Sequence, residues 1–198
     1  MLKHPKHPIV KNDVWELTLR GIGYGPLMSS HRGDDWVNNK VLEFRSNDIV
    51  PIGSELYHVT FDVNDDFITV ERITEKLADR FKLSTNCECI STNLVDRYLM
   101  AEFKDDVKWS DRVRLDKFSA TESSVVVSTS PEWEALYRVT RSDEWTAHTL
   151  NSGGEWAVRG FTYQVLSIVP PQDIPEGHVV GWIELRLKEQ NPEHPAVN

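Results

Sequence analysis

Cysteine and long hydrophobic stretches are both scarce in this chain of 198 residues. Its two cysteines, Cys87 and Cys89, are one residue apart, a spacing poorly suited to an ordinary disulfide. Disulfides are also unnecessary, because a chain of this length buries roughly 70 % of its unfolded surface on folding. The longest apolar stretch, 165–169, is far shorter than the roughly 20 residues that span a membrane, and no apolar segment follows the charged N-terminus. We therefore expect no signal peptide and no membrane span, and a cytoplasmic protein, free or incorporated into a larger particle.

An excess of positive charge is absent as well. The chain has 22 lysines and arginines against 31 aspartates and glutamates, a formal net charge of −9 at pH 7 with neutral histidines. Negative charge repels phosphate backbones and anionic lipids, so we expect neither nucleic acid nor a membrane as a partner. No run of acidic residues is longer than two, so much of this charge is attributed to ordinary solvation.

Alternation of apolar and polar residues with a period of two dominates the chain, and this period is typical of strands. Tyr57 and Val59, for example, alternate with His58 and Thr60. We predict an α+β, β-rich fold built mainly from antiparallel sheet, arranged as a sandwich or a partly open barrel of about eight or nine strands. The candidate strands are 14–20, 40–45, 56–63, 112–118, 122–129, 145–150, 156–169 and 178–187.

Two segments carry helical signals instead. Apolar residues recur at helical spacing from Phe67 to Phe81, directly after aspartates that suit an N-cap. The second segment begins with Ser130 and Pro131, an N-cap serine followed by a proline at the first helical position. The sequence therefore predicts helices at 67–82 and 131–140.

The domain organisation follows from where these patterns stop. Residues 1–12 are polar with two His-Pro pairs, and 189–198 have the same character, so we expect an extended N-terminal arm and a loose C-terminal tail. The part between them, 13–188, is predicted to form a single domain. The polar stretch 104–111 is the place where a subdivision would fall.

His58 and Thr60 are the candidate catalytic residues, because positions i and i+2 of a strand point to the same face. Together with the polar loop and predicted helix that follow, His58-Val59-Thr60 resembles half of a 2H phosphoesterase. That resemblance implies an enzyme that uses two His-x-Thr/Ser motifs on RNA or cyclic nucleotides. A second motif is missing here: His148 is followed directly by Thr149, and His178 has no hydroxyl two residues later. A single histidine cannot supply an acid/base pair, so a protein without enzymatic activity is favoured.

No cofactor or metal site is predicted. The cysteine pair lacks two further ligands at any standard spacing, and the chain has no nucleophile elbow. Glu184 and Arg186 alternate on a predicted strand, which is the pattern of an exposed strand face.

Tryptophan is the unusual component, with seven residues. Trp15, Trp156 and Trp182 have apolar neighbours and are predicted to lie in the core. Two others have polar neighbours, and aromatic side chains in such surroundings are typical of binding hot spots. The predicted partner-binding residues are Trp36 with Asp34 and Asp35, and Trp109.

Three hypotheses about function remain. The first is a non-enzymatic protein-binding or assembly component that associates with a protein partner or with itself; components of viral or phage particles are one such class. The second is an acidic inhibitor or immunity-type protein that masks a basic surface. The third is a 2H-phosphoesterase-like enzyme built on His58 and Thr60.

Overall fold

The computed structural model describes residues 10–11, 16–20, 27–32, 35–62, 67–73, 75–84, 87–92, 98–104, 107–121, 123–135, 138–158 and 160–190. The chain divides into two compact units. Unit 1 comprises Met1–Asp96 and Pro171–Trp182, and unit 2 comprises Arg97–Pro170 and Ile183–Asn198. The single domain at 13–188 stays a prediction. Most of the predicted arm and tail lies outside the described residues, although Val10–Lys11 forms a strand.

The described residues are β-rich, which confirms this part of the predicted class, whereas the helical part is almost absent. They form eighteen strands, about twice the predicted number, and one short helix. The strand pairs with a described register run antiparallel, except that β17 and β5 run parallel. None of the sheets closes into a barrel. No helix in the described part of the chain has the length and apolarity needed to cross a membrane.

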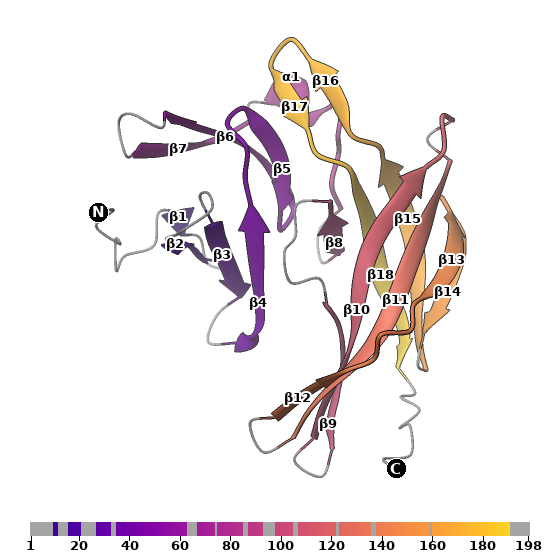
Figure 1. Cartoon of the computed structure of the whole chain (residues 1–198). Helices are drawn as coiled ribbons and strands as arrows, with labels where there is room; N and C mark the ends of the chain where they lie inside the picture. Colours follow the sequence, from indigo (N-terminus) through magenta and orange to yellow (C-terminus); the bar gives the residue numbers. More distant parts are fainter. Residues whose placement is uncertain are drawn as a thin grey trace. The chain divides into compact units, whose positions relative to one another are not determined.

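Unit 1 contains two sheets (Figure 1). The first has its strands in chain order: β1 (Val10–Lys11), β2 (Glu16–Arg20), β3 (Leu27–Arg32) and β4 (Asp35–Glu43). The second has the order β16 (Gln172–Ile174), β17 (Gly177–Val179), β5 (Asp48–Ile52), β6 (Glu55–Asp62) and β7 (Phe67–Arg72). The remaining elements of unit 1 are α1 (Glu75–Ala78) and β8 (Glu88–Ser91).

The centre of the second sheet carries much of the core of unit 1. All five residues of β5, which lies between β6 and the parallel strand β17, are buried, so both faces of this strand are covered. Ile49 and Val50 of β5 and Val59 of β6 are fully buried, and Val179 of β17 is buried with them. β5 thereby joins the β6–β7 hairpin, which follows it directly, to the β16–β17 hairpin, which is distant in the sequence.

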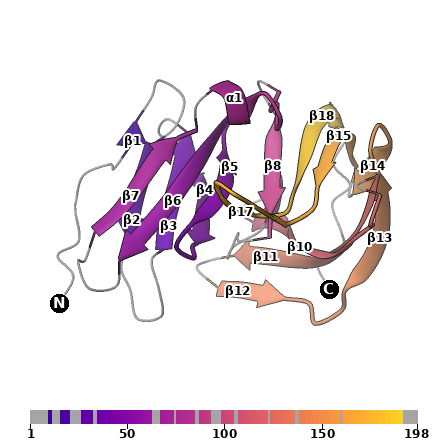
Figure 2. The same ribbon diagram turned by 90° about the horizontal axis from the view of Figure 1, so that it is seen from above.

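Unit 2 is built around a long hairpin, β10 (Val107–Phe118) and β11 (Ser124–Ala135), visible in Figures 1 and 2. The strand β9 (Tyr98–Lys104) pairs with β10. On the other side of β11, β13 (Thr146–Asn151) pairs with the first half of that strand and β12 (Arg138–Arg141) with its end. A further sheet contains, in this order, β14 (Glu155–Val158), β15 (Phe161–Val169) and β18 (Trp182–Gln190), whose first residue belongs to unit 1.

The core of unit 2 draws on both of its sheets. Val127 of β11, Val165 of β15 and Leu185 of β18 are fully buried. The ring centroids of His148 on β13 and Trp156 on β14 lie 5.9 Å apart, so the two sheets are in contact at this point. This burial confirms that Trp156 is a core residue, as Trp182 is in unit 1.

The helix predicted at 67–82 is wrong over most of its length. Phe67–Arg72 is the strand β7, paired with β6, and only Glu75–Ala78 is helical. The apolar residues Ile68 and Val70 also satisfy a period of two, and β-branched side chains favour a strand. The strand β6 precedes this segment in the sequence, and its outer edge has no other partner in the described sheet. The segment pairs with that edge instead of forming a helix.

The helix predicted at 131–140 is also wrong, because the segment forms the end of β11 and β12. Pro131 is compatible with β11 because of where the partner of that strand changes. Its carbonyl accepts a hydrogen bond from the Ser142 N–H (3.0 Å), and the N–H and C=O of one strand residue face the same neighbour. The side of Pro131 that lacks an N–H therefore faces the gap between the end of β13 and the start of β12. Neither strand requires a hydrogen bond from Pro131 there.

Candidate functional site

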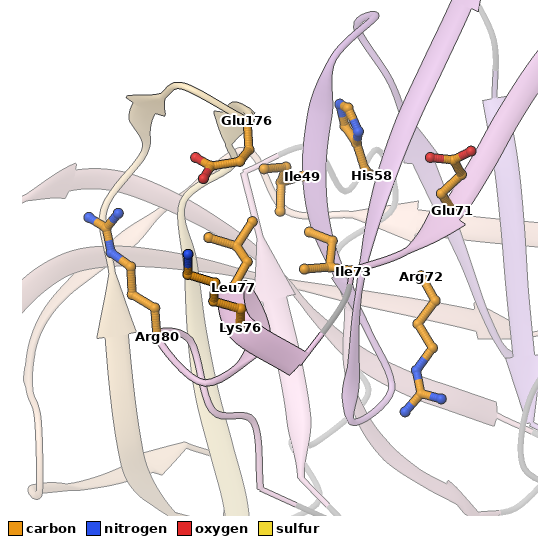
Figure 3. Close-up of a pocket in the computed structure, with 9 residues that line it drawn as sticks. All are labelled: Ile49, His58, Glu71, Arg72, Ile73, Lys76, Leu77, Arg80 and Glu176. Atoms are coloured by element: carbon orange, nitrogen blue, oxygen red, sulfur yellow. The ribbon is translucent and has the colours of Figure 1, made fainter.

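A cleft of about 440 Å³ opens on unit 1 beside the β5–β6–β7 sheet, and Figure 3 shows the side chains that line it. Three parts of unit 1 contribute: the sheet, α1 with the turn after it, and the turn between β16 and β17. We call this site the His58 cleft. Its lining residues are Ile49, His58, Glu71, Arg72, Ile73, Lys76, Leu77, Arg80 and Glu176.

His58 is held in a cross-strand row. It pairs with Ile49 on β5 and with Glu71 on β7, and directly opposed residues of a sheet share one face. Its Nε2 atom lies 2.7 Å from Oδ1 of Asn47. Because an amide oxygen only accepts hydrogen bonds, this contact requires the tautomer in which the Nε2–H of His58 is the donor.

Asn47 in turn is held by the β16–β17 hairpin. Asn47 has a positive φ of 78°, and its carbonyl accepts a hydrogen bond from the His178 N–H at 2.8 Å. Gly177, with φ of 153°, packs so closely that an added Cβ would lie 2.7 Å from the Asn47 carbonyl oxygen and 3.3 Å from His58 Nε2. Only glycine fits this position without displacing the backbone that orients His58.

Two of the cations of the His58 cleft have partners elsewhere. The guanidinium of Arg72 contacts the Glu55 carboxylate at 2.8 Å, and Figure 3 shows the side chain pointing away from the cleft. Arg80 donates to Gln172 Oε1 at 3.1 Å and lies over the Phe81 ring. The remaining charged lining residues, Glu71, Lys76 and Glu176, are exposed and form no ion pair with another residue that the structure describes.

Among the described residues of unit 1, Asp48 has the buried carboxylate, on β5 beside Ile49. Only 3 % of this residue is exposed, and its Oδ2 accepts a hydrogen bond from the Arg45 N–H at 2.8 Å. Burial raises the pKa of Asp48 above the ordinary value of an aspartate; the Arg45 hydrogen bond and the charges of His178 and Arg45 oppose this shift without cancelling it.

Thr60 lies two residues beyond His58 on β6 and is half-buried. Its cross-strand partner is Thr69 of β7, and Thr60 is not among the residues that line the cleft. Among the lining residues His58 is the single histidine, so the described cleft does not pair it with a second imidazole. The catalytic role of His58 and Thr60 stays a prediction.

For the predicted partner-binding residues the structure describes at most the backbone. Trp36 and Asp35 belong to β4 and Trp109 to β10, but the structure describes none of their side chains, and Asp34 falls in a gap. Their role stays a prediction.

A different tryptophan is well placed on unit 2. The Trp145 ring contacts two guanidinium groups. The distance from the Trp145 ring to Cζ is 5.0 Å for Arg112 and 4.4 Å for Arg114. The two arginines alternate with the buried Val113 on β10, so they share the face opposite the core. We call Arg112, Arg114 and Trp145 the Trp145 stack.

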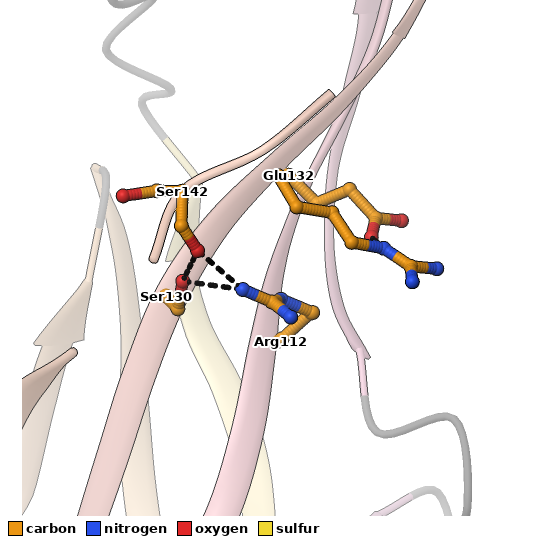
Figure 4. Close-up of polar contacts among 5 residues, drawn as sticks. Arg112, Ser130, Glu132 and Ser142 are labelled. Carbon is orange, nitrogen blue, oxygen red and sulfur yellow. Dashed lines mark hydrogen bonds and ion pairs between the residues drawn. The ribbon is translucent and has the colours of Figure 1, made fainter. Parts of the chain in front are cut away.

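Polar contacts at the point where β11 changes partner hold the Trp145 stack in place (Figure 4). Arg112 Nη2 donates to Ser130 Oγ at 2.9 Å and to the Ser142 carbonyl at 2.5 Å. Ser130 is fully buried, and its hydroxyl donates to the same carbonyl at 2.8 Å. Beside them, Arg141 forms an ion pair with the buried carboxylate of Glu132 at 2.5 Å. These bonds fix β10, β11 and the turn before Trp145 to one another.

One prediction about exposure is wrong. Glu184 was assigned to an exposed strand face, but only 2 % of it is exposed, and its Oε2 accepts a hydrogen bond from the Ser167 hydroxyl at 3.0 Å. Its neighbours Ile183 and Leu185 are fully buried too, so this part of β18 is covered on both faces. The apolar run directly before Glu184 is the sequence signal for such a strand.

Comparison with known proteins identifies no relative: no protein-family model, curated protein or solved structure matches this chain significantly. In the parts of the chain that the structure describes, no three histidine, cysteine or acidic side chains gather as a metal site would require.

Proposed function

We propose that this protein is a non-enzymatic protein-binding or assembly component, and that the Trp145 stack belongs to its contact surface. The observation that carries the proposal is the stack itself, in which one indole is held by two arginines on the face opposite the core. Tryptophan and arginine are the residues most enriched at the energetic centres of protein interfaces.

The way in which the stack is held also favours recognition. Binding costs less when the contacting side chains are already ordered, because fewer rotamers are lost on association. Trp145 is half-buried against its arginines, and Arg112 is bonded to Ser130 and Ser142. Arg114 forms an ion pair with Oδ1 of Asp116 at 2.7 Å, and its side chain remains 49 % exposed at the surface.

The charge of the stack indicates which partner suits it. Two guanidinium groups on one indole favour a partner surface that offers carboxylates or aromatic rings. The rival hypothesis, an inhibitor that masks a basic surface, draws its support from the net charge of −9 alone. A component of a viral or phage particle is one form of the proposal, and its support is the β-rich build.

Substitution of Trp145 tests the proposal. Self-association is measured by sedimentation velocity on the purified chain, and stoichiometric companions are identified after purification from the cells that produce it. We expect Trp145→Ala to weaken the resulting complex about tenfold or more. Leu187→Ala is the control, because Leu187 is an apolar residue of unit 2 outside the stack, 47 % exposed on β18. A strictly monomeric chain without a companion, or a complex that Trp145→Ala leaves unchanged, contradicts the proposal.

A further inference from the structure

The strand β12 is an open edge of the sheet that carries the Trp145 stack. Of the strands that the structure describes, only β11 pairs with β12, and Figures 1 and 2 show β12 at the periphery of unit 2. An edge strand presents main-chain N–H and C=O groups with which a further strand can pair. We call the side of Arg138–Arg141 that faces away from β11 the β12 edge.

The register identifies the groups that the β12 edge presents. The Ser142 N–H donates to the Pro131 carbonyl, and bonded pairs alternate with unbonded pairs along an antiparallel ladder. The next pair, Arg141 with Glu132, is therefore unbonded, and so is the pair two residues further on that contains Val139. The main-chain groups of Val139 and Arg141 consequently point away from β11.

The side chains of the same two residues lie on the face of the Trp145 stack. Arg141 is opposite Glu132, and Arg112 of the stack is opposite Ser130. Because Ser130 and Glu132 are two residues apart on β11, they and the residues opposite them share one face. Val139, two residues before Arg141, lies on this face as well. A strand added at the β12 edge would therefore extend the surface that the stack occupies.

The β12 edge carries positive charge and has no carboxylate of its own. The strand reads Arg-Val-Thr-Arg, and the Arg141 side chain is 55 % exposed although it contacts Glu132. On the same face, Arg112 is bonded to a hydroxyl and to a carbonyl, both of which are uncharged. Val139 is 45 % exposed. An added segment thus meets one apolar and one cationic side chain, and a carboxylate suits the cation.

Charge also separates two possible occupants of this edge. Pairing of two copies across a two-fold axis at Thr140 would gather Arg138 and Arg141 of both copies, with no acid from either strand. Like charges on neighbouring strands destabilise a sheet. An acidic segment of another protein avoids this repulsion and gains attraction instead.

From this arrangement we propose that the β12 edge binds an extended, acidic segment of a partner protein as an added antiparallel strand. A carboxylate of the segment lies opposite Arg141, and an aliphatic side chain two residues later lies opposite Val139. Main-chain hydrogen bonds provide affinity in this mode of recognition, and the alternate side chains provide specificity. The inference deepens the proposed function and rests on it, because it states how a protein partner approaches beside the Trp145 stack.

The first test uses the peptide N-acetyl-Thr-Glu-Thr-Val-Thr amide as the probe and follows hydrogen exchange in the full chain. We expect exchange at the Val139 and Arg141 amides to slow, because these N–H groups gain acceptors. The Thr140 amide already faces β11 and should be unchanged. Protection of alternate residues is specific to strand addition. Unchanged exchange at Val139 and Arg141, or equal slowing at all three amides, overturns the proposal.

The second test removes hydrogen bonds from either side of the added pair. Val139→Pro deletes an outward N–H but no bond to β11, and edge strands tolerate proline at such positions. We expect it to lower the affinity for the peptide about fivefold or more, the cost of one hydrogen bond. Protection of the Ser142 amide shows whether β12 still pairs with β11 in the variant. N-methylation of the peptide valine should cause a similar loss with the protein unchanged. If neither change weakens binding, the proposal fails.

The third test concerns the charge. We expect Arg141→Gln to lower the affinity roughly two- to fivefold, the range for an exposed charge pair, and to have no effect on a peptide that carries glutamine in place of glutamate. Arg186→Gln is the matched control, because it removes the same charge at an exposed position of β18 in unit 2. Equal losses in Arg141→Gln and Arg186→Gln would show that net charge controls binding, and would refute the proposed register.

Val139→Pro and Trp145→Ala together separate this inference from the proposed function. A complex that Trp145→Ala weakens and Val139→Pro leaves unchanged supports the stack as a contact surface and refutes strand addition. Peptide binding that Val139→Pro weakens, with complexes that Trp145→Ala leaves unchanged, supports strand addition and contradicts the role of the stack. Self-association that Val139→Pro abolishes, in a chain that does not bind the acidic peptide, would assign the edge to a second copy and overturn the acidic partner.

Discussion

Gly177 is the position where a single methyl group should disturb the His58 cleft most. An added Cβ would lie 2.7 Å from the Asn47 carbonyl oxygen, closer than side-chain carbons approach backbone oxygens, and 3.3 Å from Nε2 of His58. The φ of 153° is itself a value that residues with a side chain rarely adopt. Gly177→Ala therefore combines backbone strain with a steric overlap that no flexible side chain can relieve.

The expected cost follows from these two contributions. A strained backbone conformation costs of order 1–3 kcal/mol, and overpacking typically costs a further 1–3 kcal/mol. We therefore expect Gly177→Ala to lower the local stability of the β16–β17 hairpin by about 2–6 kcal/mol. Gly153→Ala is the matched control: Gly153 also has a positive φ, 78°, but nothing lies within 4 Å of the added Cβ. It should cost about 1–2 kcal/mol, from the backbone alone.

Native-state hydrogen exchange measures both costs, because it reports opening free energies residue by residue and so treats the two units separately. The informative amide for Gly177→Ala is that of His178, which donates to the Asn47 carbonyl. For Gly153→Ala it is the amide of Val165, which donates to the Gly154 carbonyl. Equal losses at the two sites would refute the reasoning, because the close approach of Gly177 to Asn47 would then contribute nothing.

Three further changes test other parts of the structure. The pKa of Asp48 is raised in the folded chain, so the folded chain binds a proton more tightly than the unfolded chain, and its stability falls as pH rises above the ordinary aspartate value of 3.8. The variant Asp48→Asn should not show this fall when its stability is measured by urea unfolding across pH. Parallel pH profiles of the two proteins would contradict the assignment. Ser130→Ala removes a buried hydroxyl that accepts from Arg112, and we expect a loss of about 1–3 kcal/mol at the Ser142 amide by hydrogen exchange; an unchanged exchange rate would show that the bond contributes little. We expect no cleavage of RNA or of cyclic nucleotides by the wild-type chain; cleavage that disappears in a folded His58→Ala variant would instead support the phosphoesterase hypothesis.

The strand content could be predicted from the sequence, but the two predicted helices were wrong. Segment 67–82 fits both a period of two and a helical period, so its pattern alone does not decide between them. The edge of β6 decides, because Thr69 and Val70 find partners there in Thr60 and Val59. Ser130-Pro131 in turn has the composition of a helix start, yet it marks the position where β11 exchanges β13 for β12.

The candidate sites were predictable only in part. His58 was singled out because it lies on an alternating strand, and it does line a cleft. The residues that surround it, Lys76 and Glu176, are separated from it by long stretches of sequence and carry no motif. Trp145 has polar neighbours like those of Trp36, but its stacking on Arg112 depends on the turn that brings it back over β10.

The β-rich character of this protein could be read from the sequence, because a period of two in hydrophobicity is a local property that each strand carries alone. The sequence also determined the core positions of Trp156 and Trp182, whose neighbours are apolar. The tertiary structure alone decided which segments pair, which acid is buried and what surrounds His58. Those outcomes depend on contacts between residues far apart in the chain, and no short stretch of sequence contains both partners.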